Sequence, residues 1–148
     1  MEFLYEELYF YYIALKTKFI SFDKYSIWLD KAFLVSDISD EILLELQFCT
    51  HSLEETIEKM YIYLYDKLNS LDYQVVMKLI IHELKMQYES KTPLYDVTKK
   101  LYSIWCLLPI EISSEKPFFI LNSIDDPWSW GGEKEVVKII NDLLDYYE

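Results

Sequence analysis

Apolar residues recur every three or four positions in most parts of this chain, which is the period of one buried helix face. The stretch Ser52–Glu55 is a capping box, in which the serine hydroxyl and the glutamate bind backbone N–H groups reciprocally. Ser21, and Thr92 followed by Pro93 as the first helical residue, indicate two more helix starts. The pattern predicts helices over residues 2–20, 21–35, 40–49, 52–69, 72–89, 92–108 and 133–148.

The periodicity fades between residues 109 and 132. Three of the four prolines, both glycines and two of the four tryptophans lie in this stretch. Long irregular loops in compact domains are often functional or mobile. We therefore expect an irregular segment near 109–132, in which residues 117–121 form either a short strand or a plug in the core.

The size and composition favour one ordered domain. A chain of 148 residues with 52% apolar content can bury a core without disulfides or metals. Its 18% aromatic content argues against disorder, despite the net charge of -12. We expect an all-α fold in a single helical domain over residues 1–148, either a compact bundle or a short solenoid-like stack of about six to seven helices.

Two features bear on the cellular compartment. Cys49 and Cys106 lie in apolar helical stretches, which predicts buried free thiols. Glu2, Glu6 and Glu7 stand where a secretory signal needs basic residues, and no apolar run approaches the roughly 18 residues of a membrane span. These features predict a cytoplasmic protein without a membrane segment.

The charge favours a basic partner over nucleic acid. The chain has 26 acidic residues against 14 basic ones, and every basic residue is lysine. The acidic excess lies at the two ends, with nine acids against four lysines up to residue 50 and nine against three after residue 100. Such a surface repels phosphate backbones and attracts basic proteins. We expect a protein partner and no direct nucleic-acid binding.

The common catalytic patterns are missing. The only glycines are the neighbours Gly131 and Gly132, so a glycine-rich phosphate loop is excluded. His82 is followed by Glu83, but the zinc-protease helix needs a second histidine at position 86, which is Met86. Neither cysteine has the polar surroundings that activate a thiol. We expect no enzyme activity, no cofactor and no metal.

One set of residues could form a protein interface. Large aromatic side chains supply most of the energy at such interfaces, and charges set the association rate. The candidate partner-binding residues are Glu111, Glu115, Asp125, Asp126, Trp128 and Trp130.

Three other interpretations stay open. The two tryptophans could instead pin the segment to the core. The four carboxylates could hold a divalent cation for hydrolysis, although solvated loop charges are the more common case. A second acidic patch, at Asp37, Asp40, Glu41 and Glu45, is an alternative interface.

Two stretches near the N-terminus carry a resemblance, KFISFDKYSIWLDK at residues 18–31 and SDEILLEL at 39–46. They resemble a family of small helical bacterial proteins, and the whole chain is similar in style to the immunity proteins encoded beside polymorphic or contact-dependent toxins. The resemblance covers about the first third of the chain in pattern. It implies an inhibitor of a cognate toxin domain, often a basic nuclease. The alternative from a different class is a helical scaffold or regulatory subunit that binds a protein or peptide.

Overall fold

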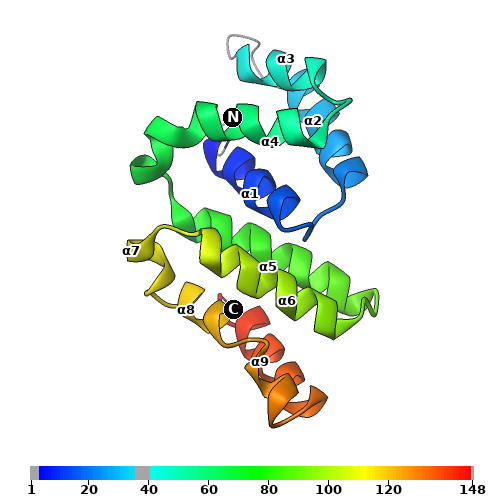
Figure 1. Cartoon of the computed structure of the whole chain (residues 1–148), viewed down its shortest axis with the longest axis vertical. Coiled ribbons are helices and arrows are strands. Elements are labelled where there is room, and N and C mark those ends of the chain that lie inside the picture. Colours follow the sequence, from blue (N-terminus) through cyan, green and yellow to red (C-terminus); the bar gives the residue numbers. More distant parts are fainter. Residues whose placement is uncertain (1–3, 36–40, 148) are drawn as a thin grey trace. The chain divides into compact units, whose positions relative to one another are not determined.

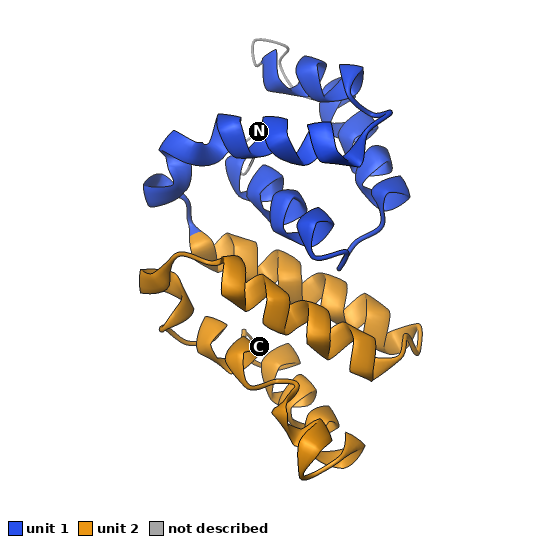
Figure 2. Cartoon of the chain, viewed as in Figure 1, with its two compact units in different colours: residues 1–72 blue, residues 73–148 orange. Residues whose placement is uncertain are grey.

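The computed structural model describes residues 4–35 and 41–147, and these form two compact units, Met1–Asp72 and Tyr73–Glu148 (Figure 2). The expected all-α class is confirmed for the described residues, which contain nine α-helices and two 3-10 helices. Seven of the α-helices correspond to the seven expected segments. The additional two lie in the stretch expected to be irregular. The single domain stays a prediction.

The first unit contains four α-helices and one 3-10 helix (Figure 1). They are α1 (Leu4–Lys16), α2 (Phe22–Val35), α3 (Glu41–Phe48), α4 (Leu53–Leu64) and η1 (Tyr65–Ser70). Helix α1 packs on α4 and α2, and α3 packs on α2 and α4. Leu8, Ile13 and Ala14 of α1 are completely buried. The near-continuous apolar pattern of this helix therefore reflects burial on almost every side.

Local capping starts two helices of this unit, α2 and α4, where the sequence predicts. The Ser52 hydroxyl accepts the backbone N–H of Glu55 at 3.2 Å, and the Ser21 hydroxyl accepts the N–H three residues on, also at 3.2 Å. The expected return bond of the capping box, from the Ser52 N–H to the Glu55 carboxylate, is replaced by other contacts. The N–H of Ser52 donates to the carbonyl of Cys49, and the Glu55 carboxylate lies 3.4 Å from His51 Nε2.

A buried tyrosine lies at the centre of an aromatic cluster in the first unit. Tyr25 of α2 is completely buried among Tyr11, Phe22 and Trp28, with ring centroids 5.4 to 6.0 Å away. Its hydroxyl has no hydrogen-bond partner. Burial raises the pKa of this phenol, so the group is neutral at all ordinary pH values.

The acidic start of α1 contains a pH-sensitive group. Burial raises the pKa of the Glu7 carboxyl, against a hydrogen bond from Trp28, while the charge of Glu6 raises it further. A raised folded-state pKa means that protonation favours folding, and this contribution is lost as the pH rises through the folded pKa. Glu7→Gln removes the charge that burial disfavours and should therefore raise the free energy of unfolding at pH 7. Urea titrations should show a smaller gain at pH 4; a larger gain there would contradict the assignment.

The second unit contains the segments that hold the candidate site. Helix α5 packs on α6 and α9, α8 packs on α6 and α7, and η2 packs on α9. Phe118, Leu121 and Ile140 are completely buried in this unit. Its helices are α5 (Tyr73–Glu89), α6 (Leu94–Leu107), α7 (Ile110–Ser113), α8 (Phe118–Asn122), η2 (Asp126–Ser129) and α9 (Glu133–Leu144).

The start of α6 corrects one prediction. Thr92 is not the N-cap of α6, and no side chain among the described residues caps this helix. The N–H of Thr92 donates to the carbonyl of Gln87 at 3.0 Å, and the N–H of Lys91, at φ 58°, donates to the carbonyl of Tyr88. This pair of bonds is the Schellman motif that ends α5. Pro93 has a non-helical ψ of 119° and stands at the N-cap position, so α6 begins one residue later than expected.

The stretch from 109 to 132 is not irregular, because it forms the short helices α7, α8 and η2. Residues 118–121 belong to a helix and not to a strand. Phe118 and Leu121 are completely buried, which agrees with the core-plug alternative. Periodicity failed to reveal these helices because a single turn is too short to show a repeat.

The two cysteines differ in exposure. Cys49 is buried as expected, whereas Cys106 is exposed. The buried face of α6 contains Leu101 and Ile104, and a residue two positions after Ile104 points to the opposite side of a helix. His82 is also exposed.

One thiol per chain should react quickly with a disulfide reagent. An exposed thiol is accessible to the reagent, whereas a buried one reacts only after local opening. We expect Cys106 to react within minutes and Cys49 to react only on denaturation. Absorbance of the released thiolate measures both phases, and Cys106→Ser should remove the fast one. A fast phase that persists in this variant would contradict the structure.

Candidate partner-binding surface

One exposed stripe runs along α6. Tyr95, Lys99, Tyr102 and Cys106 follow one another at helical spacing and are all exposed, while Val97, Thr98, Leu101 and Ile104 form the opposite, buried face. The Tyr102 ring stacks on Trp105 with centroids 6.0 Å apart. The helix therefore presents aromatic rings to solvent with a single cation between them.

Trp128 of η2 is attached to this helix. Its indole N–H donates to the Thr98 hydroxyl at 2.9 Å, and its ring meets the Tyr95 ring edge-on with centroids 5.6 Å apart. Thr98 is completely buried and also donates to the carbonyl of Leu94. Trp128 therefore pins the segment to α6, as in the alternative interpretation of the tryptophans.

Asp125 already has a cation of its own. The Lys99 ammonium lies 3.0 Å from the Asp125 carboxylate, whose side chain is only 12% exposed. This bond raises the pKa of Lys99, and the ammonium also lies over the Tyr95 ring, 5.1 Å from its centroid. The negative charge of Asp125 is therefore offset within the chain and serves to fix η2 against α6.

Asp126 is exposed and precedes Trp128 by two residues. The pKa of Tyr102 is raised, first by a hydrogen bond with Cys106 and further by the charges of Asp125 and Asp126. The two aspartates thus lie near enough to act on Tyr102. We call the residues Tyr95, Lys99, Tyr102, Asp125, Asp126 and Trp128 the α6–η2 surface.

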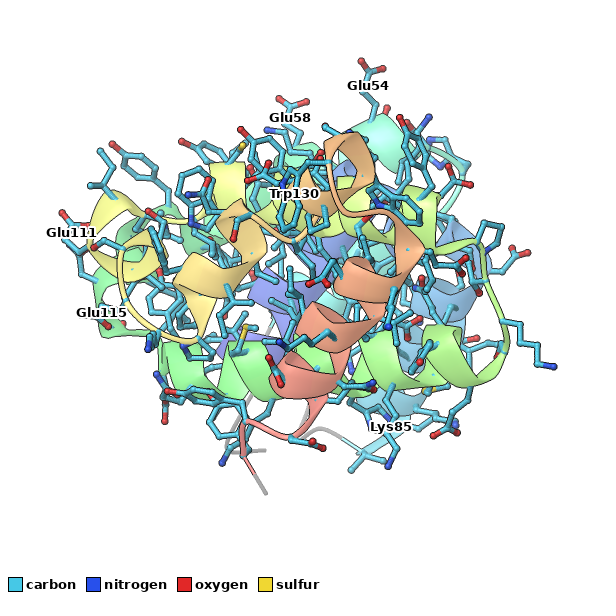
Figure 3. The ribbon with its side chains drawn as sticks, turned by 90° about the horizontal axis from the view of Figure 1, so that it is seen from below. Glu54, Glu58, Lys85, Glu111, Glu115 and Trp130 are labelled. Carbon is cyan, nitrogen blue, oxygen red and sulfur yellow. The ribbon has the colours of Figure 1, made fainter. Side chains whose placement is uncertain are left out.

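Glu111 and Glu115 lie elsewhere in the same unit. Both are exposed, at and just beyond α7, and that helix is held by a 2.8 Å hydrogen bond from the Trp105 indole to the Ser113 carbonyl. Trp105 follows Thr98 by seven residues, or about 10 Å along a helix axis. In Figure 3, Glu111 and Glu115 lie together and well apart from Trp130.

The six candidate residues thus fall into two groups. Asp125, Asp126 and Trp128 gather near the start of α6, and Trp130 follows them on the chain. Glu111 and Glu115 lie near the end of α6. The six residues therefore do not come together as one continuous surface.

The second acidic patch is described only in part. Glu41 and Glu45 are exposed on α3, one helical turn apart. Asp37 and Asp40 lie outside the described residues. The patch stays an alternative interface.

The residues on the exposed face of α6 were not among the candidate interface residues predicted from the sequence. Tyr95, Lys99 and Tyr102 belong to a helix that the sequence reveals by its apolar face, and they lie on the opposite face. Two tyrosines at i and i+7 on that face were the available signal.

Neither the family models, nor the curated proteins, nor the solved structures with which the chain was compared show a match. Within the described ranges, no helix is both long and apolar enough to cross a bilayer. Three or more histidine, cysteine, aspartate or glutamate side chains arranged to hold a metal ion are not found among the residues described.

Proposed function

We propose that this chain is an immunity protein, which binds and neutralises a basic toxin domain such as a nuclease. The observation that carries the proposal is the α6–η2 surface, where exposed tyrosines lie beside an exposed aspartate on a chain of net charge -12. Aromatic side chains bury much area at little entropic cost, and the acidic field speeds the approach of a basic partner.

The negative net charge of both units supports binding to a basic partner. The first unit has 14 acids against 6 lysines, and the second has 12 against 8. Lys99, the cation in the middle of the α6–η2 surface, is bound to Asp125. It therefore opposes an incoming cation less than a free lysine would.

A scaffold or regulatory subunit is the second candidate. The end of α4 exposes Tyr61 and Ile62, the latter 67% exposed, and the adjoining start of η1 exposes Tyr65. Three large apolar side chains within five residues are more than scattered surface residues. This face favours a second protein contact, as in a subunit that joins two partners.

Growth of a laboratory bacterium tests the immunity function. The C-terminal domain encoded immediately upstream of this chain is expressed alone, with this chain, and with an unrelated acidic helical protein as control. The proposal expects that the domain is toxic and that only this chain restores growth. Rescue by the unrelated protein, or failure of rescue despite good expression of this chain, would leave the scaffold function in the lead.

Three double variants with the same loss of charge locate the interface. They are Asp126→Asn with Glu133→Gln, Glu111→Gln with Glu115→Gln, and Glu54→Gln with Glu58→Gln as the control in the first unit. The first pair should slow association with the toxin domain about tenfold at low salt, and the control by less than about threefold. Stopped-flow kinetics at two salt concentrations measure this. Equal effects of all three pairs would show that only total charge matters.

A further inference from the structure

Trp130 stands out among the exposed side chains of the second unit. Its side chain is 72% exposed, although tryptophan is highly buried on average. Trp128, two residues earlier, is held by Thr98 and Tyr95. The two indoles therefore have different surroundings, and only that of Trp130 is largely open to solvent.

The backbone beneath Trp130 is fixed by a tight turn. The carbonyl of Pro127 accepts three backbone N–H groups, those of Trp130, Gly131 and Gly132, at 3.2, 2.7 and 2.6 Å. Pro127 is itself buried. The turn holds the tryptophan backbone in one position before any partner arrives, which lowers the entropic cost of binding.

Gly132 makes this turn possible. It has φ 74° and ψ -168°, a region that is essentially restricted to glycine. The same residue is the N-cap of α9, so the turn joins a regular helix directly. The only glycine pair in the chain thus lies immediately after its most exposed tryptophan.

Several carboxylates lie close to the turn in the chain. Asp126 precedes Trp130 by four residues and Glu133 follows it by three, and both are exposed, while the Glu135 side chain lies against Gly131. Lys134 is the one lysine between residues 125 and 135. A group that receives this indole therefore meets mainly negative charge at its rim.

We infer that Trp130 is a preorganised anchor that enters an apolar pocket rimmed by lysines or arginines on a basic protein. The inference rests on the proposed function, which identifies that basic protein as the toxin domain. It adds to this function the side chain that makes the main contact. Trp128 and Gly132 are positioning residues that hold the anchor. Tryptophan buried at an interface centre typically dominates the binding energy.

Binding to the upstream toxin domain tests the anchor. Trp130→Ala should raise the dissociation constant about 30-fold or more, mainly through faster dissociation. Trp130→Phe should recover part of the lost affinity. Ile27→Ala is the control, because Ile27 is 58% exposed in the first unit and belongs to no proposed contact face. It should change the constant less than about threefold.

Gly132→Ala separates positioning from contact. The alanine variant keeps the indole but disturbs the turn, so it should weaken binding about tenfold. Quenching of tryptophan fluorescence by acrylamide should show an indole that is protected by the partner in the native complex and less protected in this variant. Native affinity in both Trp130→Ala and Gly132→Ala would overturn the inference while leaving growth rescue, and so the proposed function, intact.

If the upstream domain does not bind, the proposed function fails and a second experiment decides the inference. A photoreactive benzoylphenylalanine is placed at position 130 or at the exposed control position 27 of the full chain in its own bacterium. The inference expects that position 130 alone crosslinks to one protein of strongly basic isoelectric point. The absence of a crosslink at 130, or a crosslink to an acidic protein, would overturn it.

Discussion

Replacing Trp128 with alanine should lower the free energy of unfolding by about 3 kcal/mol, because a large side chain packed on Tyr95 and its hydrogen bond to Thr98 are both lost. Trp130→Ala is the matched variant two residues away. It should change the same free energy by less than about 0.5 kcal/mol, since that side chain is mostly in solvent.

Urea denaturation followed by far-ultraviolet circular dichroism measures both variants. Trp128→Phe should fall between them, because it retains the edge-on ring contact but cannot donate to Thr98. Equal destabilisation by Trp128→Ala and Trp130→Ala would contradict the different roles assigned to the two indoles.

Two substitutions of Tyr25 should act in opposite directions. Tyr25→Ala should lower the free energy of unfolding by about 3–5 kcal/mol, because it leaves a cavity among Tyr11, Phe22 and Trp28. Tyr25→Phe removes only the buried hydroxyl, which has no hydrogen-bond partner. Since such a group costs about 1–3 kcal/mol to bury, phenylalanine should stabilise the fold by up to about 1 kcal/mol.

The same urea titrations apply, with Tyr65→Phe as the control for an exposed hydroxyl. That control should leave the stability unchanged within about 0.5 kcal/mol. A loss of stability in Tyr25→Phe would mean that the hydroxyl has a polar partner in solution.

These experiments distinguish residues that build the surface from residues that are free to bind. Asp125 and Trp128 are bound to Lys99 and Thr98, so their removal should act first on stability. Asp126 and Trp130 are exposed and should act first on association and dissociation. The proposed interface therefore uses fewer of the candidate residues than the sequence suggested. It also includes the exposed face of α6, which the sequence did not indicate.

Much of the helical pattern follows from local chemistry. The Ser52 and Ser21 hydroxyls accept the expected N–H groups, and the two helices begin beside them. Local reasoning placed the N-cap of α6 one residue too early, at Thr92. Its backbone completes the turn that ends α5, and α6 starts after Pro93. It also failed for the single-turn helices between residues 109 and 132.

The sequence by itself determined the all-α class, the seven longer helices and the acidic, aromatic character of the chain, because period, capping and charge are local properties. Only the tertiary structure decided the role of each candidate residue. Lys99 reaches Asp125 across 26 positions and Thr98 meets Trp128 across 30, and no local pattern encodes such contacts. The tertiary contacts leave Trp130 exposed and hold Trp128 in place, although the two stand two residues apart.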